Sequence, residues 1–189
     1  MKKTLILACV ILMAALTVQP VMGQKYMKTD FRLDGNFPAG ALYRDLYGAV
    51  NPKFNLGLGF NMFKRVEIRL EVSYFQDKGG TSVTDEETIF KYTSYGGGFR
   101  VRFLQMKSQS IYLGTGFKYC PYSEEVPERF NDYSDNATAL YVELGDYWYL
   151  NNTFYLNLNG RYSFLNVAPL KEDINLGGVQ IGVGIGVRY

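Results

Sequence analysis

The chain has 189 residues, with 20 lysine and arginine residues against 18 aspartate and glutamate residues and no histidine. This length suits one domain, and a formal net charge of +2 lacks the basic surplus of a nucleic-acid-binding surface, so we expect no nucleic-acid partner. The absence of histidine removes the commonest general base and disfavours enzymes that rely on it, which leaves a carboxylate or lysine base as the alternative.

Residues 1–23 have the three-part pattern of a secretory signal peptide. Two lysines precede the unbroken apolar run of residues 5–18, and Val21-Met22-Gly23 offers the recognition site for a signal peptidase. We predict cleavage after Gly23, within a few residues. A buried N-terminal helix is the alternative. A lipoprotein site at Cys9 is disfavoured because too little of the apolar run precedes it.

Cleavage would leave a chain with one cysteine and balanced charge. Only Cys120 would remain, so the exported domain must be stable without an internal disulfide. Lys2 and Lys3 would be lost, leaving 18 basic and 18 acidic residues. No later stretch approaches the ~20 apolar residues of a membrane helix. If this chain spans a membrane, it does so with strands.

Apolar and polar residues alternate with a period of two along most of the remaining chain, and this pattern predicts strands. It is clearest in residues 66–75, VEIRLEVSYF, where apolar residues alternate with Glu67, Arg69, Glu71 and Ser73. About eight strands are expected, at residues 31–37, 54–62, 66–75, 98–103, 111–118, 140–148, 153–164 and 179–189.

The expected connections alternate between long and short. The long ones are residues 38–50, 77–89, 121–138 and 167–174, and the short ones are 64–65, 105–110 and 151–152. Short turns on one side and longer loops on the other are typical of outer-membrane barrels, whose short turns face the periplasm. This order would place both termini on the periplasmic side.

The polarity of the two strand faces distinguishes a membrane barrel from a soluble one. One face is nearly free of charge and rich in aromatic residues, as a lipid-facing band requires. The other is rich in glycine, asparagine and charge, which suits a crowded polar lumen. We expect a paired charge network there, formed by Arg32, Asp34, Glu67, Arg69, Glu71, Arg100, Arg102, Lys118, Glu143, Arg161 and Arg188. A conducting path is the alternative, but eight strands enclose little more than side chains, which disfavours a general diffusion pore.

The closing residues, VGIGVRY, resemble the C-terminal assembly signal of small outer-membrane β-barrel proteins, the family that includes OmpX and the membrane domain of OmpA. Gly184, Val187 and Tyr189 match this signal, whereas Gly182 and a terminal tyrosine depart from its usual form. The resemblance implies an all-β, antiparallel up-and-down transmembrane β-barrel in the outer membrane. It also implies contact with outer-membrane lipid and lipopolysaccharide, and with periplasmic chaperones and the barrel-assembly machinery during export.

The sequence lacks the common motifs of catalysis and cofactor binding. It has no G-x-S-x-G elbow, P-loop, GxGxxG or cysteine–histidine metal set. We therefore expect a non-enzymatic protein with no catalytic residue, metal or cofactor, which supports the envelope or makes contacts through its loops. An enzyme acting on lipid or peptide at the outer rim and a soluble lipocalin-like carrier are the alternatives.

One expected outer loop, residues 121–138, is strongly acidic. Its carboxylates could contact divalent cations or a protein partner, although an ordinary solvated loop is the alternative. The candidate contact residues are Glu124, Glu125, Glu128, Asp132 and Asp135.

Overall fold

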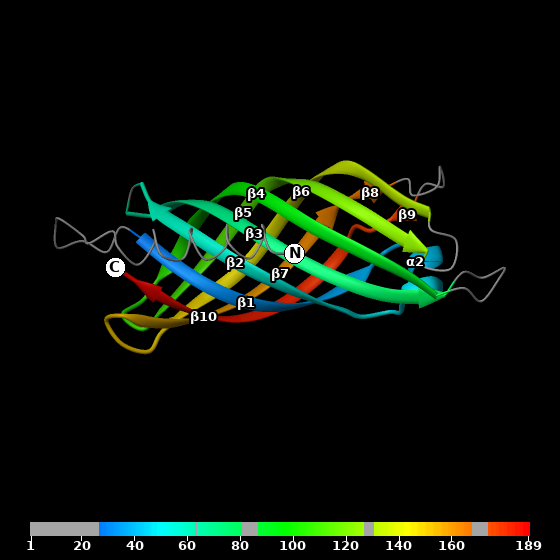
Figure 1. Ribbon diagram of the computed structural model, residues 1–189. Coiled ribbons are helices and arrows are strands. Elements are labelled where there is room, and N and C mark those ends of the chain that lie inside the picture. The colour runs from blue at the N-terminus through cyan, green and yellow to red at the C-terminus, as the bar shows by residue number, and fades with distance from the viewer. Residues whose placement is uncertain (1–26, 63, 81–86, 127–130, 168–173) are drawn as a thin grey trace.

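The computed structural model describes residues 27–62, 64–80, 87–126, 131–167 and 174–189. Eight strands close into an antiparallel barrel in the order β1–β10–β7–β6–β5–β4–β3–β2 (Figure 1). They are β1 (Met27–Pro38), β2 (Asn51–Asn61), β3 (Val66–Gly80), β4 (Glu87–Gln105), β5 (Gln109–Val126), β6 (Asn131–Tyr149), β7 (Phe154–Phe164) and β10 (Gly178–Arg188). The predicted up-and-down barrel of about eight strands is confirmed. The expected signal peptide lies outside the described residues.

The first and last strands close the barrel. Phe31 of β1 lies opposite Ile185 of β10, and the two strands pair over eleven positions, from Lys28↔Arg188 to Pro38↔Gly178. The backbone N–H of Tyr189 donates to the carbonyl of Met27 at 2.9 Å. The two described chain ends therefore meet at the barrel end that also carries the short connections, residues 62–65, 106–108 and 150–153. The helix α2 (Ala41–Tyr47) and a small hairpin of β8 (Asn166–Val167) and β9 (Ile174–Asn175) lie at the opposite end (Figure 1).

A band of exposed apolar side chains surrounds the central part of the barrel. Alternate residues of each strand point outward because successive side chains of a strand lie on opposite faces. The band includes Phe31, Leu33, Phe54, Leu70, Phe99, Val101, Leu113, Phe117, Leu140, Val142, Leu144, Phe164, Ile181, Val183 and Ile185. Among the described residues, no helix is long and apolar enough to cross a membrane.

Four strands are much longer than the sequence pattern predicted. β3 to β6 have 15, 19, 18 and 19 residues, whereas the other barrel strands have 11 or 12. The β5–β6 ladder continues to Val126↔Asn131, so most of residues 121–138 is a hairpin and not the expected loop. The β3–β4 ladder likewise continues to Gly80↔Glu87 and shortens the expected loop 77–89. In both ladders the pleat continues unchanged, but the inward face becomes apolar and the outward face polar.

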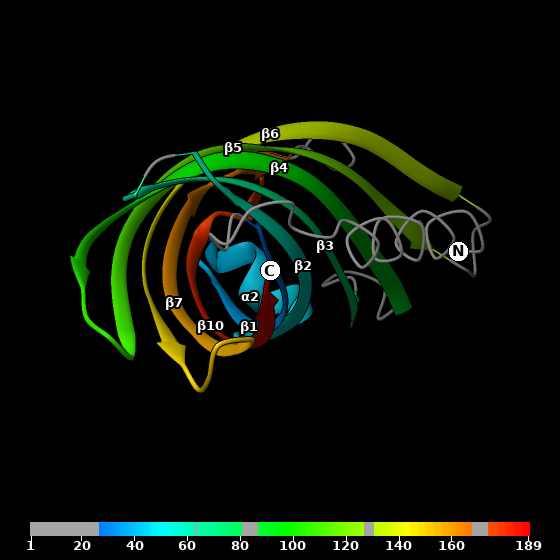
Figure 2. The same cartoon turned by 90° about the vertical axis from the view of Figure 1, so that its left-hand side faces the viewer.

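The expected loop 38–50 contains α2. Tyr43 and Tyr47 are four residues apart, so both side chains lie on one face of this short helix, and both are buried. Gly48 ends the helix with a φ of 97°, a left-handed conformation that glycine adopts without a steric penalty. Seen from the end that holds the C-terminus, α2 lies within the ring of strands (Figure 2). The helix therefore covers the opposite mouth of the barrel.

We predict that a basic residue in the apolar band destabilises the protein in a depth-dependent way. Leu113 lies in the band between Val101 and Leu144 on the neighbouring strands. In lipid vesicles, Leu113→Arg should lower the free energy of unfolding by about 2–4 kcal/mol. The control Leu150→Arg lies in the turn after β6 and should cost about 0–1 kcal/mol. Equal losses would mean that lipid does not cover this band.

Candidate functional site

The lumen of the barrel is filled by ion pairs that join opposite walls. Glu71 of β3 accepts a hydrogen bond from Arg32 of β1 at 2.9 Å and one from Arg161 of β7 at 2.8 Å. The ammonium group of Lys118 on β5 lies 2.6 Å from the same carboxylate. All four side chains are at most 3% exposed. One carboxylate on β3 thus neutralises cations from three other strands.

A second carboxylate continues this network on the far wall. Glu143 of β6 accepts hydrogen bonds from Arg100 of β4 at 2.6 Å and from Arg161 at 2.8 Å. Arg161 therefore bridges the two carboxylates. Because buried charges are tolerated only when they are paired and hydrogen-bonded, these contacts are what allow so much charge inside a narrow barrel.

A third group of ion pairs lies toward the chain ends. Lys28 contacts Glu67 at 2.7 Å, and Arg69 donates to Asp30 at 2.7 Å with a second, parallel contact. Buried tyrosine hydroxyls complete the coordination of these acids. Tyr147 donates to Glu67 at 2.8 Å and Tyr155 to Asp30 at 2.9 Å.

Glycines on the inward face make room for these long side chains. A Cβ at Gly57 would overlap the guanidinium of Arg69, and one at Gly184 would overlap the side chain of Arg32. Gly98 and Gly116 similarly lie beneath the hydroxyl of Tyr141. Each glycine is placed where a neighbouring side chain must lie flat against the wall. The lumen glycines are therefore a packing requirement of the charge network.

The remaining predicted lumen residues take other partners. Asp34 accepts a hydrogen bond from Asn55 at 2.7 Å, and Arg102 donates to Asn61 at 3.0 Å. Arg188 departs from the expectation: its guanidinium donates to the backbone carbonyl of Asn151 at 2.9 Å and lies over the ring of Tyr149. It is the last residue of β10, so it reaches the rim and not the lumen.

Sequence reasoning missed several inward-facing residues. Lys28 and Asp30 lie on β1 four and two residues before Arg32, on the same face, so extending that strand backward would have found them. Lys53 precedes the expected start of its strand, and it is also buried. Alternation did place Tyr112 and Tyr147 on the inward face, where both are buried. It gave no sign that tyrosine hydroxyls would take part in the charge network.

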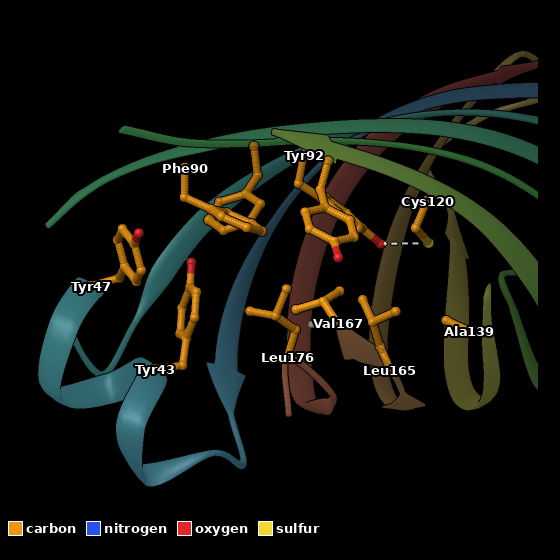
Figure 3. Close-up of a cluster of buried hydrophobic side chains, with 11 residues drawn as sticks. Tyr43, Tyr47, Phe90, Tyr92, Cys120, Ala139, Leu165, Val167 and Leu176 are labelled. Atoms are coloured by element: carbon orange, nitrogen blue, oxygen red, sulfur yellow. Dashed lines mark hydrogen bonds between the residues drawn. The ribbon is translucent and has the colours of Figure 1, made fainter. Parts of the chain in front are cut away.

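The outer mouth is closed by a second kind of packing, which we call the outer cluster (Figure 3). Tyr43 and Tyr47 of α2 stack at 4.8 Å between ring centres, and Tyr47 lies 5.7 Å from Phe90 of β4. The hydroxyl of Tyr92 and the thiol of Cys120 form a hydrogen bond of 3.1 Å. The buried members are Tyr43, Tyr47, Phe75, Phe90, Tyr92, Cys120, Tyr122, Ala139, Leu165, Val167 and Leu176.

Hydrogen bonds to two carboxylates fasten α2 over this cluster. Tyr43 donates to Asp77 at 2.9 Å, and Tyr47 donates to Glu124. Asn51 also donates to Asp77. Tyr74 is the last exposed apolar residue of β3, so Asp77 lies beyond the apolar band. Burial raises the pKa of Asp77 to about 6, and the hydrogen bond from Tyr43 opposes this only in part.

The acidic residues of the expected contact loop are not gathered in one place. Glu124 points inward to Tyr47, whereas Glu125 points outward and pairs with Lys91. Asp135 is exposed and accepts the backbone N–H of Asn136 at 2.7 Å. Glu128 and the side chain of Asp132 lie outside the described part. Within the described ranges, no three cysteine, aspartate or glutamate side chains are placed to hold a metal ion.

The assembly-signal residues lie along the closing strand. Gly184 faces the lumen opposite Arg32, and Val187 lies opposite Thr29. Tyr189 is partly exposed at the rim. Recognition of these residues during assembly stays a prediction.

Several solved structures share this architecture. Neisserial surface protein A is 15% identical, with a TM-score of 0.62 over 87% of this chain and 96% of that one. Ail, the attachment invasion locus protein of Yersinia pestis, is 17% identical, with a TM-score of 0.58 over 88% and 99%. The outer membrane protein OprG from Pseudomonas aeruginosa is 14% identical, with a TM-score of 0.67 over 90% and 99%. The chain has the fold of small outer-membrane β-barrel proteins. No protein-family model and no curated protein sequence matches it.

We predict that Glu71→Ala strongly destabilises the barrel, because it leaves Arg32, Arg161 and Lys118 without their shared carboxylate. The free energy of unfolding, measured in lipid vesicles, should fall by about 3–5 kcal/mol. The control Glu125→Ala removes a half-exposed ion pair with Lys91 and should cost less than about 1 kcal/mol. Similar losses for both variants would show that the lumen is hydrated.

We also predict that acid stabilises the docked position of α2. When α2 leaves the mouth, Asp77 returns to water and to its ordinary pKa of 3.8, so the docked state binds the proton more tightly. Lowering the pH from 7 toward 4.5 should therefore slow hydrogen exchange at residues 44–48, after correction for intrinsic rates. Asp77→Asn should abolish this dependence. Faster exchange in acid in the unmodified protein would contradict the assignment.

Proposed function

We propose that this chain is a non-enzymatic integral protein of the bacterial outer membrane that contacts an external macromolecule through its outer end. Three observations support the location: the predicted signal peptide, the exposed apolar band and the fold shared with outer-membrane proteins. In this orientation, the short turns and chain ends face the periplasm, and α2 and the long hairpins face outward.

The observation that carries the proposal is the unequal length of the strands. β6 pairs with β7 only as far as Leu140↔Phe164, but it continues to pair with β5 for nine further positions. β3 likewise outlasts β2, whose ladder ends at Phe54↔Tyr74. At about 3.3 Å per residue, β3 and β6 remain paired with β4 and β5 for roughly 20–30 Å past the points where their ladders with β2 and β7 end. A rigid, paired sheet is a better binding scaffold than a solvated loop, because its side chains are already ordered.

The outward face of this extension has a composition suited to contact. It carries the cross-strand rows Tyr95–Tyr119–Thr138 and Lys91–Ser123–Ser134, with Pro121 opposite Asn136 between them. Tyrosines with serine, threonine and asparagine give large, ordered contact area together with adaptable hydrogen bonding. Among the similar structures, one is described as a surface protein and another as an attachment invasion locus protein. A contact role is in keeping with those descriptions.

The packing of the interior supports a non-enzymatic role and disfavours free diffusion of solutes. The carboxylates that could act as general bases, Glu67, Glu71 and Glu143, are buried and held in ion pairs with lysine or arginine. The ion pairs and the outer cluster lie in series along the lumen. Both features favour an interior that stabilises the barrel and a function that lies on its outer surface.

The closing strand gives a second, independent proposal about assembly. We propose that Gly184, Val187 and Tyr189 are read by the barrel-assembly machinery, as the resemblance of the C-terminal sequence implies. Val187 and Tyr189 lie near the periplasmic rim in the proposed orientation, where such a signal would be accessible before closure.

To test the contact role, a deletion strain would be complemented with the wild-type protein or with Ser123→Arg/Asn136→Arg, which places two bulky cations on the outer face. We expect the double variant to fold, judged by its heat-shifted mobility in detergent gels, but to lose the cell–surface adherence and cell–cell aggregation that the wild type restores. Ser108→Arg, in a periplasmic turn, is the matched control and should behave as the wild type.

Detergent sensitivity distinguishes this role from envelope support. If adherence is unchanged by the double variant while deletion alone makes cells detergent-sensitive, the protein supports the envelope and the contact proposal is wrong.

A further inference from the structure

Three exposed cations lie on two neighbouring turns at the barrel end that holds the chain ends. Lys64 and Arg65 belong to the turn between β2 and β3, and Lys107 belongs to the turn between β4 and β5. The backbone N–H of Arg102 on β4 donates to the carbonyl of Arg65 at 2.8 Å, so the first turn lies against the strand that leads to the second. Within the described ranges, none of the three cations forms an ion pair with a carboxylate.

The acidic groups near these turns do not neutralise them. Glu67, near the start of β3, points into the lumen and pairs with Lys28 at 2.7 Å. Asp146, on the outward face of β6, accepts hydrogen bonds from Gln109 and Trp148 through one oxygen, and its other oxygen is buried. The C-terminal carboxylate follows β10, which β1 separates from the turn between β2 and β3. The two turns therefore form a local positive patch.

A β-bulge extends the apolar band of β4 toward this patch. The register of β4 against β5 shifts between Arg102 and Leu104. Phe103 and Leu104 are consecutive, yet both are exposed, because a bulge adds one residue and interrupts the alternation. On a regular strand, one of the two would point inward. The bulge therefore adds two adjacent apolar side chains to the outward face after Val101.

The turns themselves also expose apolar side chains. Met62 lies two residues before Lys64, Met106 lies directly before Lys107, and both methionines are about half exposed. At the boundary between hydrocarbon and headgroups, apolar groups point toward the acyl chains and lysine or arginine groups reach the phosphates. A turn that projects into water gains nothing from exposed methionines. The combination indicates that both turns lie at a membrane surface.

We propose that these two turns bind anionic phospholipid in the leaflet that they face, which is the periplasmic leaflet in the proposed orientation. The site consists of Lys64, Arg65, Lys107, Phe103, Leu104 and Met106. The lipid phosphate accepts hydrogen bonds from the ammonium and guanidinium groups, and the acyl chains lie against the apolar side chains. A zwitterionic headgroup would also need a partner for its own cation, and these residues include no carboxylate. A net negative headgroup therefore fits the site better.

This inference rests on the membrane location in the proposed function, but it is independent of contact with an external partner. Loss of lipid selectivity would leave the adherence test of that function unaffected, and loss of adherence would leave the lipid site unaffected.

The first test measures lipid selectivity in the wild-type protein. The refolded barrel would be reconstituted in phosphatidylcholine vesicles with trace spin-labelled phosphatidylglycerol or phosphatidylcholine, and the motionally restricted fraction of each label measured by electron paramagnetic resonance. Phosphatidylglycerol should associate at least about fivefold more strongly, the preference expected from one lysine or arginine at an anionic surface. Equal association of the two lipids would overturn the proposal, and this outcome does not depend on whether any variant folds.

The second test assigns the selectivity to the patch. Lys64→Glu/Lys107→Glu should reduce the preference to less than about twofold, because it makes the patch net negative. Lys78→Glu/Lys91→Glu is the matched control: it changes the net charge by the same amount at the outer end and should keep the preference. Folding of both variants would be judged by heat-shifted mobility. Loss of selectivity in both variants, or in neither, would contradict the site.

A cell-wall polymer is the competing anionic partner for a positive patch. The barrel in phosphatidylcholine nanodiscs would be sedimented with purified peptidoglycan, and we expect no co-sedimentation that depends on Lys64 and Lys107. Co-sedimentation that Lys64→Glu/Lys107→Glu abolishes, without any preference for phosphatidylglycerol, would overturn the proposal and assign the patch to the cell wall.

Discussion

The pairing of charge in a space that excludes bulk water is the constraint on which the rest of this structure depends. A barrel with an apolar outer surface must turn its polar residues inward, and eight strands leave an interior just wide enough for those side chains. Glu71 and Glu143 each form ion pairs with cations from different strands, and Arg161 pairs with both carboxylates. The contacts cross the lumen, so they also hold the walls at a fixed separation.

Beyond the apolar band, the inward and outward faces of the same strands exchange their polarity. Outside it, the outward face meets water and the inward face can be apolar, so the polarity of the barrel reverses along its length. On β4, Arg100 faces inward within the band and Phe90 faces inward beyond it, ten residues away on the same side of the strand. The outer end therefore resembles a small soluble barrel with its own core, closed by α2, and it is fused to a membrane barrel filled with ion pairs. The charge network fills the part of the lumen within the apolar band, and the outer cluster fills the part beyond it.

This reversal explains what the sequence could and could not predict. Within the band, apolar-outward alternation located all eight strands, because the period of two and the direction of the apolar face agree. Beyond it, Tyr122 and Cys120 point inward while Ser123 and Glu125 point outward, so the apolar residues change sides and the pattern resembles a loop. α2 was missed because seven residues between glycines carry too short a periodic signal. The identity of the lumen pairs, such as Arg161 with both carboxylates, depends on strand register and tilt, which alternation alone does not specify. The expected loop at residues 121–138 is mostly paired strand for the same reason, so Glu124 and Glu125 lie on opposite faces. Contact of its acidic residues with a partner stays a prediction.

The central claim, that paired charges and the outer cluster close the lumen, is tested most directly by conductance. Purified, refolded protein would be reconstituted into planar lipid bilayers in 1 M potassium chloride and recorded at low voltage, with insertion verified by its heat-shifted mobility. The account predicts no steady unitary conductance, because the buried ion pairs and the outer cluster fill the lumen in the described part of the chain. Stable, porin-like steps in the wild-type protein would contradict it and would mean that the charge network lines an open channel.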